Sequence, residues 1–179
     1  MKKIVLSFTL LLFLACNQTE QKEMVSAADF NEEAEKAAIM KTIENETSSF
    51  YKRDYEGWKQ NFIQKDYAFQ GWSNGDGTFD ASVGWQAIDK RIGEYITKNP
   101  VKDGGSSHPR VERRNMAVTF FTDSLAFLVW DQYNADAENK FFTLSKDQRI
   151  MEKENGQWKI ANVSSFWDYK NKISVDSLQ

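Results

Sequence analysis

Two titratable side chains in this sequence have the chemistry of an acid or a base. His108 is the only histidine among 179 residues, and it follows a loop rich in glycine and serine. An imidazole titrates near neutrality, so His108 is a candidate general base, or else a solvated loop residue. Asp131 lies in an apolar segment, where a carboxylate can act as acid or base. Its alternative role is an ion pair with Arg113, Arg114 or Arg149.

Three tryptophans on different predicted strands are candidates for the wall of a cavity. Trp72, Trp130 and Trp167 each follow the period of two that a strand imposes on its faces. Large rings either wall a cavity or fill a core, and core packing is the alternative for all three.

The turn at Asn155-Gly156 predicts the pairing of the last two strands. In a two-residue hairpin, the numbers of paired residues have a constant sum. On this register Glu152 lies opposite Lys159, and the other face carries the pairs Lys153–Trp158 and Met151–Ile160. Further from the turn, the same count pairs Arg149 with Asn162 and Asp147 with Ser164. We predict that these four residues form a polar strip that binds a ligand.

The turn at Asp123-Ser124 gives a similar prediction for the preceding hairpin. The same count pairs Phe120 with Phe127 and Val118 with Val129. It then pairs Met116 with Asp131, which puts this carboxylate at the end of an apolar face.

Composition excludes several classes of function. The chain has a net charge of −3 with acids and bases well mixed, and no basic stripe that would indicate nucleic-acid binding. One cysteine cannot form an internal disulfide, and one histidine cannot supply a multi-histidine metal site. We predict no metal and no cofactor. With 41% hydrophobic residues, this length suits one domain with a real core.

The amino terminus reads as a targeting segment. Lys2 and Lys3 precede an apolar run from Ile4 to Leu14, which is shorter than the roughly 20 residues of a membrane span. Ala15 then stands before Cys16. This arrangement resembles a bacterial lipoprotein signal, although "FLAC" has Phe13 and Leu14 where that motif usually has an aliphatic and a small residue. An ordinary signal peptide, or a cysteine buried in a helix, is the alternative.

The lipoprotein resemblance implies a location. Residues 1–15 would be removed, Cys16 would carry acyl chains, and the polar residues up to 30 would form a flexible tether. The partner would then be a membrane of the bacterial cell envelope. Asn17 is not the aspartate that signals inner-membrane retention in some bacteria, so we expect the outer membrane, with the side left open.

The rest of the chain alternates between helix and strand patterns. A helical stripe begins near Asn31, "RDYEGWKQNF" indicates a short second helix, and a third runs from Trp85 to Ile96. A hairpin is predicted between the second and third helices, with strands at 66–72 and 79–82. A four-stranded meander follows at 110–121, 125–134, 141–153 and 158–167.

This order resembles the NTF2-like superfamily, including its SnoaL-like members. The resemblance covers Glu32 to Tyr169, and its best marks are "RDYEGWKQNF" and "MEKENGQWKIANVSSFW". It implies an α+β fold in which a curved, mostly antiparallel sheet wraps three N-terminal helices into a cone, over residues 31–170, with a tail at 171–179. The open end of such a cone commonly holds a ligand or an active site.

The catalytic residues of two enzymes of this superfamily have no counterpart at the matching positions of this chain. Aligned on "DYEG", the general base of ketosteroid isomerase falls near Gly71 or Trp72, and its oxyanion tyrosine near Glu46. Scytalone dehydratase needs a pair of histidines, and one is present.

Three hypotheses follow from the sequence. The leading one is a lipid-anchored envelope protein whose cone binds a small, partly apolar molecule. The second is an isomerase, dehydratase or hydrolase that uses Asp131 or His108 as acid or base. The third is an assembly module that forms a homodimer through its sheet, without catalysis.

Overall fold

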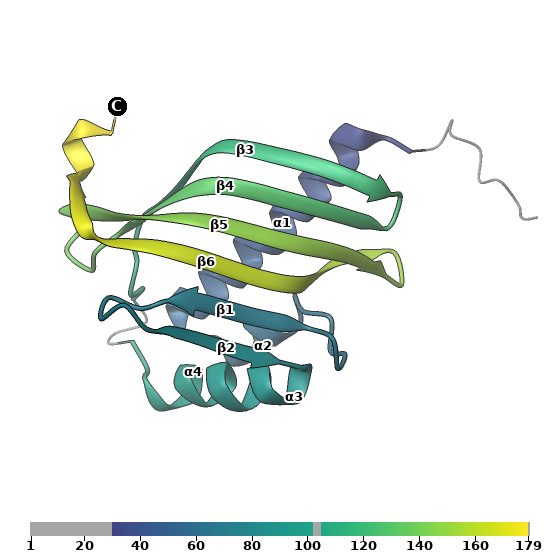
Figure 1. Cartoon of the computed structure of the whole chain (residues 1–179), viewed down its shortest axis with the longest axis horizontal. Coiled ribbons are helices and arrows are strands. Elements are labelled where there is room, and N and C mark those ends of the chain that lie inside the picture. Colours follow the sequence, from purple (N-terminus) through teal and green to yellow (C-terminus); the bar gives the residue numbers. More distant parts are fainter. Residues whose placement is uncertain (1–29, 102–104, 179) are drawn as a thin grey trace, which may run out of the picture.

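A single six-stranded sheet and the helices packed on one of its faces make up the structure (Figure 1). The computed structural model describes residues 30–101 and 105–178. The predicted signal peptide, Cys16 and nearly all of the predicted tether lie outside these residues. Among the described residues, no helix is long and apolar enough to span a membrane.

The sheet is mostly antiparallel, as the resemblance implies. Its strand order is β2-β1-β6-β5-β4-β3, and β1 runs parallel to β6 while all other neighbours are antiparallel. The bounds are β1 Phe69–Ser73, β2 Phe79–Val83, β3 Val111–Thr122, β4 Leu125–Ala135, β5 Phe141–Glu154 and β6 Gln157–Ser174. The predicted hairpin and meander are therefore confirmed. β6 continues beyond residue 170 and is followed by a 3-10 turn at Val175–Ser177, so most of the predicted tail is ordered structure.

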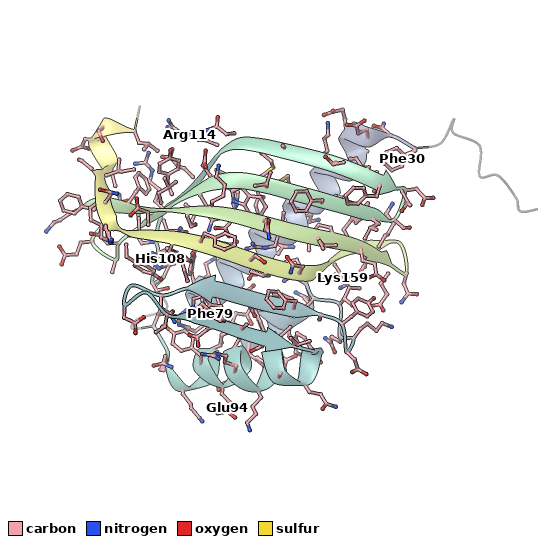
Figure 2. The ribbon with its side chains drawn as sticks, in the orientation of Figure 1. Phe30, Phe79, Glu94, His108, Arg114 and Lys159 are labelled. Carbon is pink, nitrogen blue, oxygen red and sulfur yellow. The ribbon has the colours of Figure 1, made fainter. Side chains whose placement is uncertain are left out.

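The long helix α1 (Glu32–Lys52) lies across the sheet, and its ends are fixed by side chains and backbone. Asn31 caps it, because its Oδ1 accepts a hydrogen bond from the backbone N–H of Ala34 at 3.1 Å. Phe30, which is labelled in Figure 2, lies directly before the N-cap of α1. Its ring packs edge-on against that of Phe120 of β3, with ring centroids 5.1 Å apart.

The short helix α2 (Tyr55–Lys59) is capped by Asp54, whose Oδ1 accepts from the N–H of Gly57 at 2.9 Å. The predicted third helix is a compound one: α3 (Trp85–Ile88), a π-helical turn (Asp89–Gly93) and α4 (Glu94–Lys98) follow without a break. A π-helical turn widens the helix by one residue, and such turns are frequent at functional sites.

The core lies between the helices and the inner face of the sheet. Trp58 of α2, Leu128 of β4 and Met151 of β5 are each fully buried there. This packing fixes α1 above the sheet and leaves the other end of the inner face to the candidate site.

The hairpin register predicted from Asn155-Gly156 holds near the turn and is wrong beyond it. The pairs Glu152–Lys159, Lys153–Trp158 and Met151–Ile160 are all present. A β-bulge at Ala161 then inserts one residue into β6, so that Arg149 pairs with Val163 and Asp147 with Ser165. One extra residue exchanges the two faces of a strand, because side chains alternate with a period of two.

The register predicted from Asp123-Ser124 is also wrong, for the same physical reason. Irregularities lie between Arg114 and Ala117 and between Phe120 and Thr122. Phe120 therefore pairs with Ala126 rather than Phe127, Val118 with Leu128 rather than Val129, and Asp131 with Arg114 rather than Met116.

Candidate functional site

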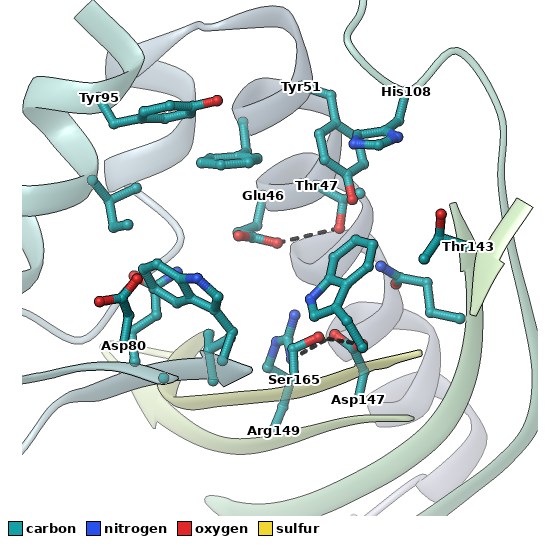
Figure 3. Close-up of a pocket in the computed structure, with 18 of the residues that line it drawn as sticks. Glu46, Thr47, Tyr51, Asp80, Tyr95, His108, Thr143, Asp147, Arg149 and Ser165 are labelled. Carbon is teal, nitrogen blue, oxygen red and sulfur yellow. Dashed lines mark hydrogen bonds and ion pairs between the residues drawn. The ribbon is translucent and has the colours of Figure 1, made fainter. Parts of the chain in front are cut away.

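A cavity of about 720 Å³ opens between α1, the inner face of the sheet and the compound helix (Figure 3). This volume lies in the range of pockets that bind small organic molecules. Residues from α1, β1, β2, the π-helical turn, α4, β4, β5 and β6 line it, together with His108 from the loop before β3 and Asp136 from the turn after β4. The cavity is therefore assembled from almost the whole length of the domain.

Six aromatic side chains line the cavity. They are Phe50, Tyr51, Trp72, Tyr95, Trp167 and Tyr169. Trp167 and Tyr169, both on β6, stack with ring centroids 5.8 Å apart. On the helical side, the Arg53 guanidinium lies over both Phe50 and Tyr95 and joins α1 to α4. These walls offer flat apolar surfaces to a ligand.

Two rows of inward-facing residues form the floor on the sheet. In the first row Gln70 of β1 pairs with Val163 of β6, which pairs with Arg149 of β5. In the second, Trp72, Ser165 and Asp147 stand in the same relation. The bulge at Ala161 is what brings Val163 and Ser165 onto this face.

Asp147 and Arg149 form a buried ion pair in the floor. Nη1 of Arg149 donates to Oδ2 of Asp147 at 3.1 Å, and these side chains are only 5% and 3% exposed. Oδ1 of Asp147 accepts from the hydroxyls of Ser145 and Ser165, at 2.6 and 2.7 Å. The Arg149 guanidinium also lies over the Trp130 ring, 5.1 Å from its centroid. These contacts hold the guanidinium in one place.

Glu46 faces this ion pair from α1, across the cavity (Figure 3). Its Oε2 accepts from the Thr47 hydroxyl at 3.2 Å, and that hydroxyl in turn accepts from Nη2 of Arg113 at 2.8 Å. Burial raises the pKa of Glu46, although the charges of Arg149 and Arg113 act in the opposite direction. The site therefore favours a neutral carboxylic acid, which can donate a hydrogen bond.

A chain of buried hydrogen bonds connects α1 with the floor. The Tyr51 hydroxyl donates to Oδ1 of Asn134 at 2.8 Å, and Nδ2 of Asn134 donates to the Ser145 hydroxyl at 3.3 Å. Ser145 then donates to Asp147. Burial raises the pKa of Tyr51, so its hydroxyl keeps its proton and remains a donor. This network fixes the polar floor relative to the helix.

His108 lies in the cavity wall with its ring orientation fixed. Its Nδ1 lies 2.5 Å from the carbonyl oxygen of Ala135, and its ring packs 4.5 Å from that of Tyr51. A carbonyl oxygen can only accept, so Nδ1 carries the hydrogen and Nε2 the lone pair in the neutral ring. Burial lowers the pKa of His108, against the opposing effect of the bond to Ala135. The imidazole is therefore neutral at pH 7, as a base must be.

The structure separates the residues predicted for the site into two groups. Five of them line the cavity: Trp72, His108, Asp147, Arg149 and Trp167. Their roles in binding or catalysis stay predictions.

The other four predicted residues do not line the cavity. Asn162 and Ser164 lie on the outer face because of the bulge, and the Ser164 hydroxyl donates to Asn162 at 3.4 Å. Trp130 is fully buried in the core beneath Arg149. Asp131 lies on the outer face, paired with Lys146 and bonded to Nδ2 of Asn115 at 2.7 Å.

These contacts correct the interpretation of Asp131 as an acid or base. The bond from Asn115 is the main cause that lowers its pKa, and Lys146 adds to it. Asp131 is therefore an ion-paired carboxylate outside the cavity. This is the alternative role that the sequence left open, except that its partner is Lys146 and not an arginine.

Sequence reasoning missed Glu46, Gln70 and Ser165. Glu46 had a signal, since it lies on the same helical stripe as Ile39 and Ile43, where a carboxylate is out of place. Gln70 lies on a short strand with few alternations, and the count from Asn155-Gly156 pairs Asp147 with Ser164 instead of Ser165. The described residues contain no group of three or more His, Cys, Asp and Glu side chains that could hold a metal ion.

The comparisons with known proteins identify the fold. The chain matches no protein-family model and no curated protein. Among solved structures it is similar to an NTF2-like protein of unknown function from Silicibacter pomeroyi, with a TM-score of 0.56, 13% identity, and 77% of this chain and 99% of that one covered.

Two further structures show how varied proteins of this shape are. The association domain of Caenorhabditis elegans CaMKII matches with a TM-score of 0.56 and 13% identity, over 75% of this chain and 96% of that one. A candidate scytalone dehydratase from Novosphingobium aromaticivorans matches with a TM-score of 0.50 and 15% identity, over 79% and 87%. With its helices held against a mostly antiparallel six-stranded sheet, this chain has the NTF2-like fold.

Proposed function

We propose that this protein binds a small, partly apolar molecule in its cavity and does so while anchored by lipid to a bacterial membrane. The observation that carries the binding proposal is the cavity of about 720 Å³, with aromatic walls above a charged floor. Ligand pockets combine apolar walls with a few fixed polar groups in this way.

Native mass spectrometry of the protein purified from its own bacterium tests the binding proposal. We expect a retained small molecule that leaves on collisional activation. Val163→Phe fills the floor of the cavity and should abolish the retained mass, while Asn162→Phe on the outer face, one position away in β6, should keep it. Protein that carries no small molecule, or equal loss in both variants, contradicts the proposal.

The anchoring proposal rests on the amino-terminal sequence. Each buried methylene of an acyl chain contributes about 0.8 kcal/mol, so two or three chains on Cys16 would hold the protein on a membrane. We expect the mature protein to begin at Cys16, with a diacylglyceryl mass on that residue, and to sediment with the outer-membrane fraction. In Cys16→Ser the acyl mass should be absent. Wild-type protein that lacks the acyl mass and remains soluble contradicts this part.

An enzyme is the second candidate, and His108 is the observation that favours it. The bond to Ala135 leaves Nε2 as the basic nitrogen of a neutral ring that lines the cavity. Such a ring can remove a proton from carbon or oxygen, as an isomerase or dehydratase requires. Once the retained molecule is known, proton NMR in D₂O would follow exchange of its C–H groups. Exchange by wild type and not by His108→Asn supports catalysis, and equal rates with and without protein argue for binding alone.

Self-association through the sheet is a third proposal. Phe166 of β6 and Ile150 of β5 are exposed on the outer face, and an association domain is among the structures of similar fold. We propose that a second copy of this chain covers this face, so that the cavity and the interface lie on opposite sides of one sheet.

A further inference from the structure

The floor of the cavity contains two buried polar groups whose hydrogen-bonding capacity is incompletely used. Gln70 is 7% exposed and Arg149 is 4% exposed, and both line the cavity. Among the described residues, Oε1 of Gln70 has no donor and Nε of Arg149 has no acceptor. Buried polar atoms in folded proteins are nearly always paired, so this coincidence in one cavity calls for an explanation.

The two groups lie in one row across three adjacent strands. Gln70, Val163 and Arg149 are successive partners on β1, β6 and β5. Since neighbouring strands lie about 4.8 Å apart, the Cα atoms of Gln70 and Arg149 are about 10 Å apart. Val163 alone stands between them and supplies a low apolar surface. The row therefore has an acceptor at one end, a cationic donor at the other, and space for a flat ring between.

The charges at the Arg149 end favour an anion. Asp147 already uses both oxygens, on Arg149, Ser145 and Ser165, so it holds the guanidinium in place without using all of its donors. Glu46 approaches the same space from α1 (Figure 3). Its tendency to stay neutral lets it donate a hydrogen bond to an oxyanion rather than repel it.

We propose that the cavity takes a ring-containing carboxylic acid that also bears a hydroxyl group. The carboxylate accepts hydrogen bonds from Arg149 and from the Glu46 carboxyl, and the hydroxyl donates to Oε1 of Gln70. The ring lies over Val163 between the aromatic walls. This inference rests on the proposed binding function and adds the chemical class of the ligand.

A cationic ligand is the rival interpretation of the aromatic walls, because ammonium groups bind over aromatic rings. The cavity is lined by cationic side chains (Arg91, Arg149 and Lys172) and by acidic ones (Glu46, Asp80, Asp136 and Asp147). Asp80 pairs with Arg91 and Asp147 with Arg149. Arg91 already lies over the Trp72 ring, 5.3 Å from its centroid, so that part of the wall has its own cation. An added ammonium would compete with Arg91 for that ring and would leave Nε of Arg149 without an acceptor.

Isothermal titration calorimetry with four naphthalene probes tests the proposal. The protein is used in the form in which it is isolated, and it is placed in lipid nanodiscs if that form is bound to a membrane. The probes are 6-hydroxy-2-naphthoate, 2-naphthoate, 2-naphthol and 2-naphthylmethylammonium. We expect the hydroxy acid to bind most tightly and the ammonium at least about tenfold more weakly than 2-naphthoate, as loss of a charged hydrogen bond implies.

Two variants test which residue binds the carboxylate of the ligand and which binds its hydroxyl. Arg149→Gln should weaken both acids at least about tenfold and leave 2-naphthol unchanged. Gln70→Leu should bring the hydroxy acid to the affinity of 2-naphthoate and leave 2-naphthoate unchanged. Lys146→Gln is the matched control, since it removes the same charge from β5 on the outer face, where Lys146 pairs with Asp131.

The outcomes separate the two levels of the proposal. If 2-naphthol or the ammonium probe binds as tightly as the hydroxy acid, or if Lys146→Gln acts like Arg149→Gln, the acid assignment is wrong while small-molecule binding stands. If none of the four probes binds and no small molecule is retained, the binding function itself is wrong. Should Arg149→Gln fail to fold, the ranking of probes and Gln70→Leu still decide the result.

Discussion

Glu46 shows what a single residue can contribute when its surroundings oppose its charge. It is 6% exposed, and burial raises its pKa despite two nearby guanidinium groups. The folded protein therefore binds a proton at Glu46 that the unfolded chain has already lost above about pH 4.5. By linkage, this group makes the fold less stable as the pH rises above that value.

We predict that Glu46→Gln increases the free energy of unfolding at pH 8 and changes it little at pH 4. The amide keeps the shape and the hydrogen bond but cannot ionise. Urea unfolding followed by tryptophan fluorescence at both pH values measures the difference. A variant that is less stable than wild type at pH 8 would show that the arginines, not burial, dominate at this position.

His108 should have the opposite dependence on pH. Burial lowers its pKa below the ordinary 6.5, so below that value the unfolded chain binds a proton that the folded protein does not. Its contribution to stability is thus complete above pH 6.5 and is lost as the pH falls toward the lowered pKa.

We predict that His108→Asn flattens the stability profile between pH 6.5 and 5. Asn can keep a donor to the Ala135 carbonyl, so the loss at pH 7.5 should be small. Urea unfolding across this range provides the measurement, and His108 is the only imidazole in the chain. An unchanged slope in the variant would place the pH-sensitive group elsewhere.

At the scale of elements, the sequence predicts where strands begin and end better than which face a residue takes. All six strands and the α1 and α2 helices follow from periodicity, turn residues and caps. The face that a residue takes is predicted by counting in twos from a turn, and one bulge residue, Ala161, reverses the faces that this count gives to Asn162 and Ser164. Nothing in the "IANVS" segment distinguishes a bulged residue from a regular one, so Asn162 and Ser164 were placed inward.

The same limit applies to the site. Trp72 and Trp167 could be found by type. Asp147 and Arg149 could be found because they lie on β5, and the residue inserted at Ala161 belongs to β6. Glu46 and Gln70 are brought to the cavity by packing between distant segments, which no local pattern contains. The π-helical turn, which positions Arg91 toward the cavity, likewise reads as an ordinary helix in the sequence.

The hairpin turn offers a direct test at this scale. Asn155 and Gly156 both have positive φ, at 52° and 77°. Gly156→Ala should cost about 1 kcal/mol, because a left-handed conformation is unfavourable for a residue with a Cβ. Chemical unfolding measures this cost. Gly75→Ala is the control: this turn glycine has no positive φ, and its added Cβ would lie 3.4 Å from Tyr169, so an equal loss in both variants would exclude backbone conformation as the cause.

The whole molecule has two faces with different chemistry. The inner face holds the cavity, whereas the outer face has Phe166, 59% exposed, as part of its apolar surface. If the outer face pairs with a second copy, light scattering should give about twice the mass of one chain. Phe166→Asp should return a monomer, because a charge at the centre of an apolar interface is costly.

Phe141 supplies the matched control for this experiment. It is 46% exposed at the first residue of β5, where the strand leaves a turn. Phe141→Asp should therefore leave the mass unchanged. A wild-type chain that remains monomeric at every concentration would contradict self-association and leave the outer face unassigned.

The imidazole of His108 in the cavity wall can serve as a built-in NMR probe for ligand binding. Because His108 is the single histidine of the chain, its two ring C–H signals in a proton NMR spectrum need no assignment by mutagenesis. The Tyr51 ring lies 4.5 Å away, so a molecule that displaces either ring, or that brings its own aromatic ring close to His108, should shift those signals through ring currents. A fragment library could thus be screened against the unlabelled protein, with one pair of resonances reporting which compounds reach the cavity.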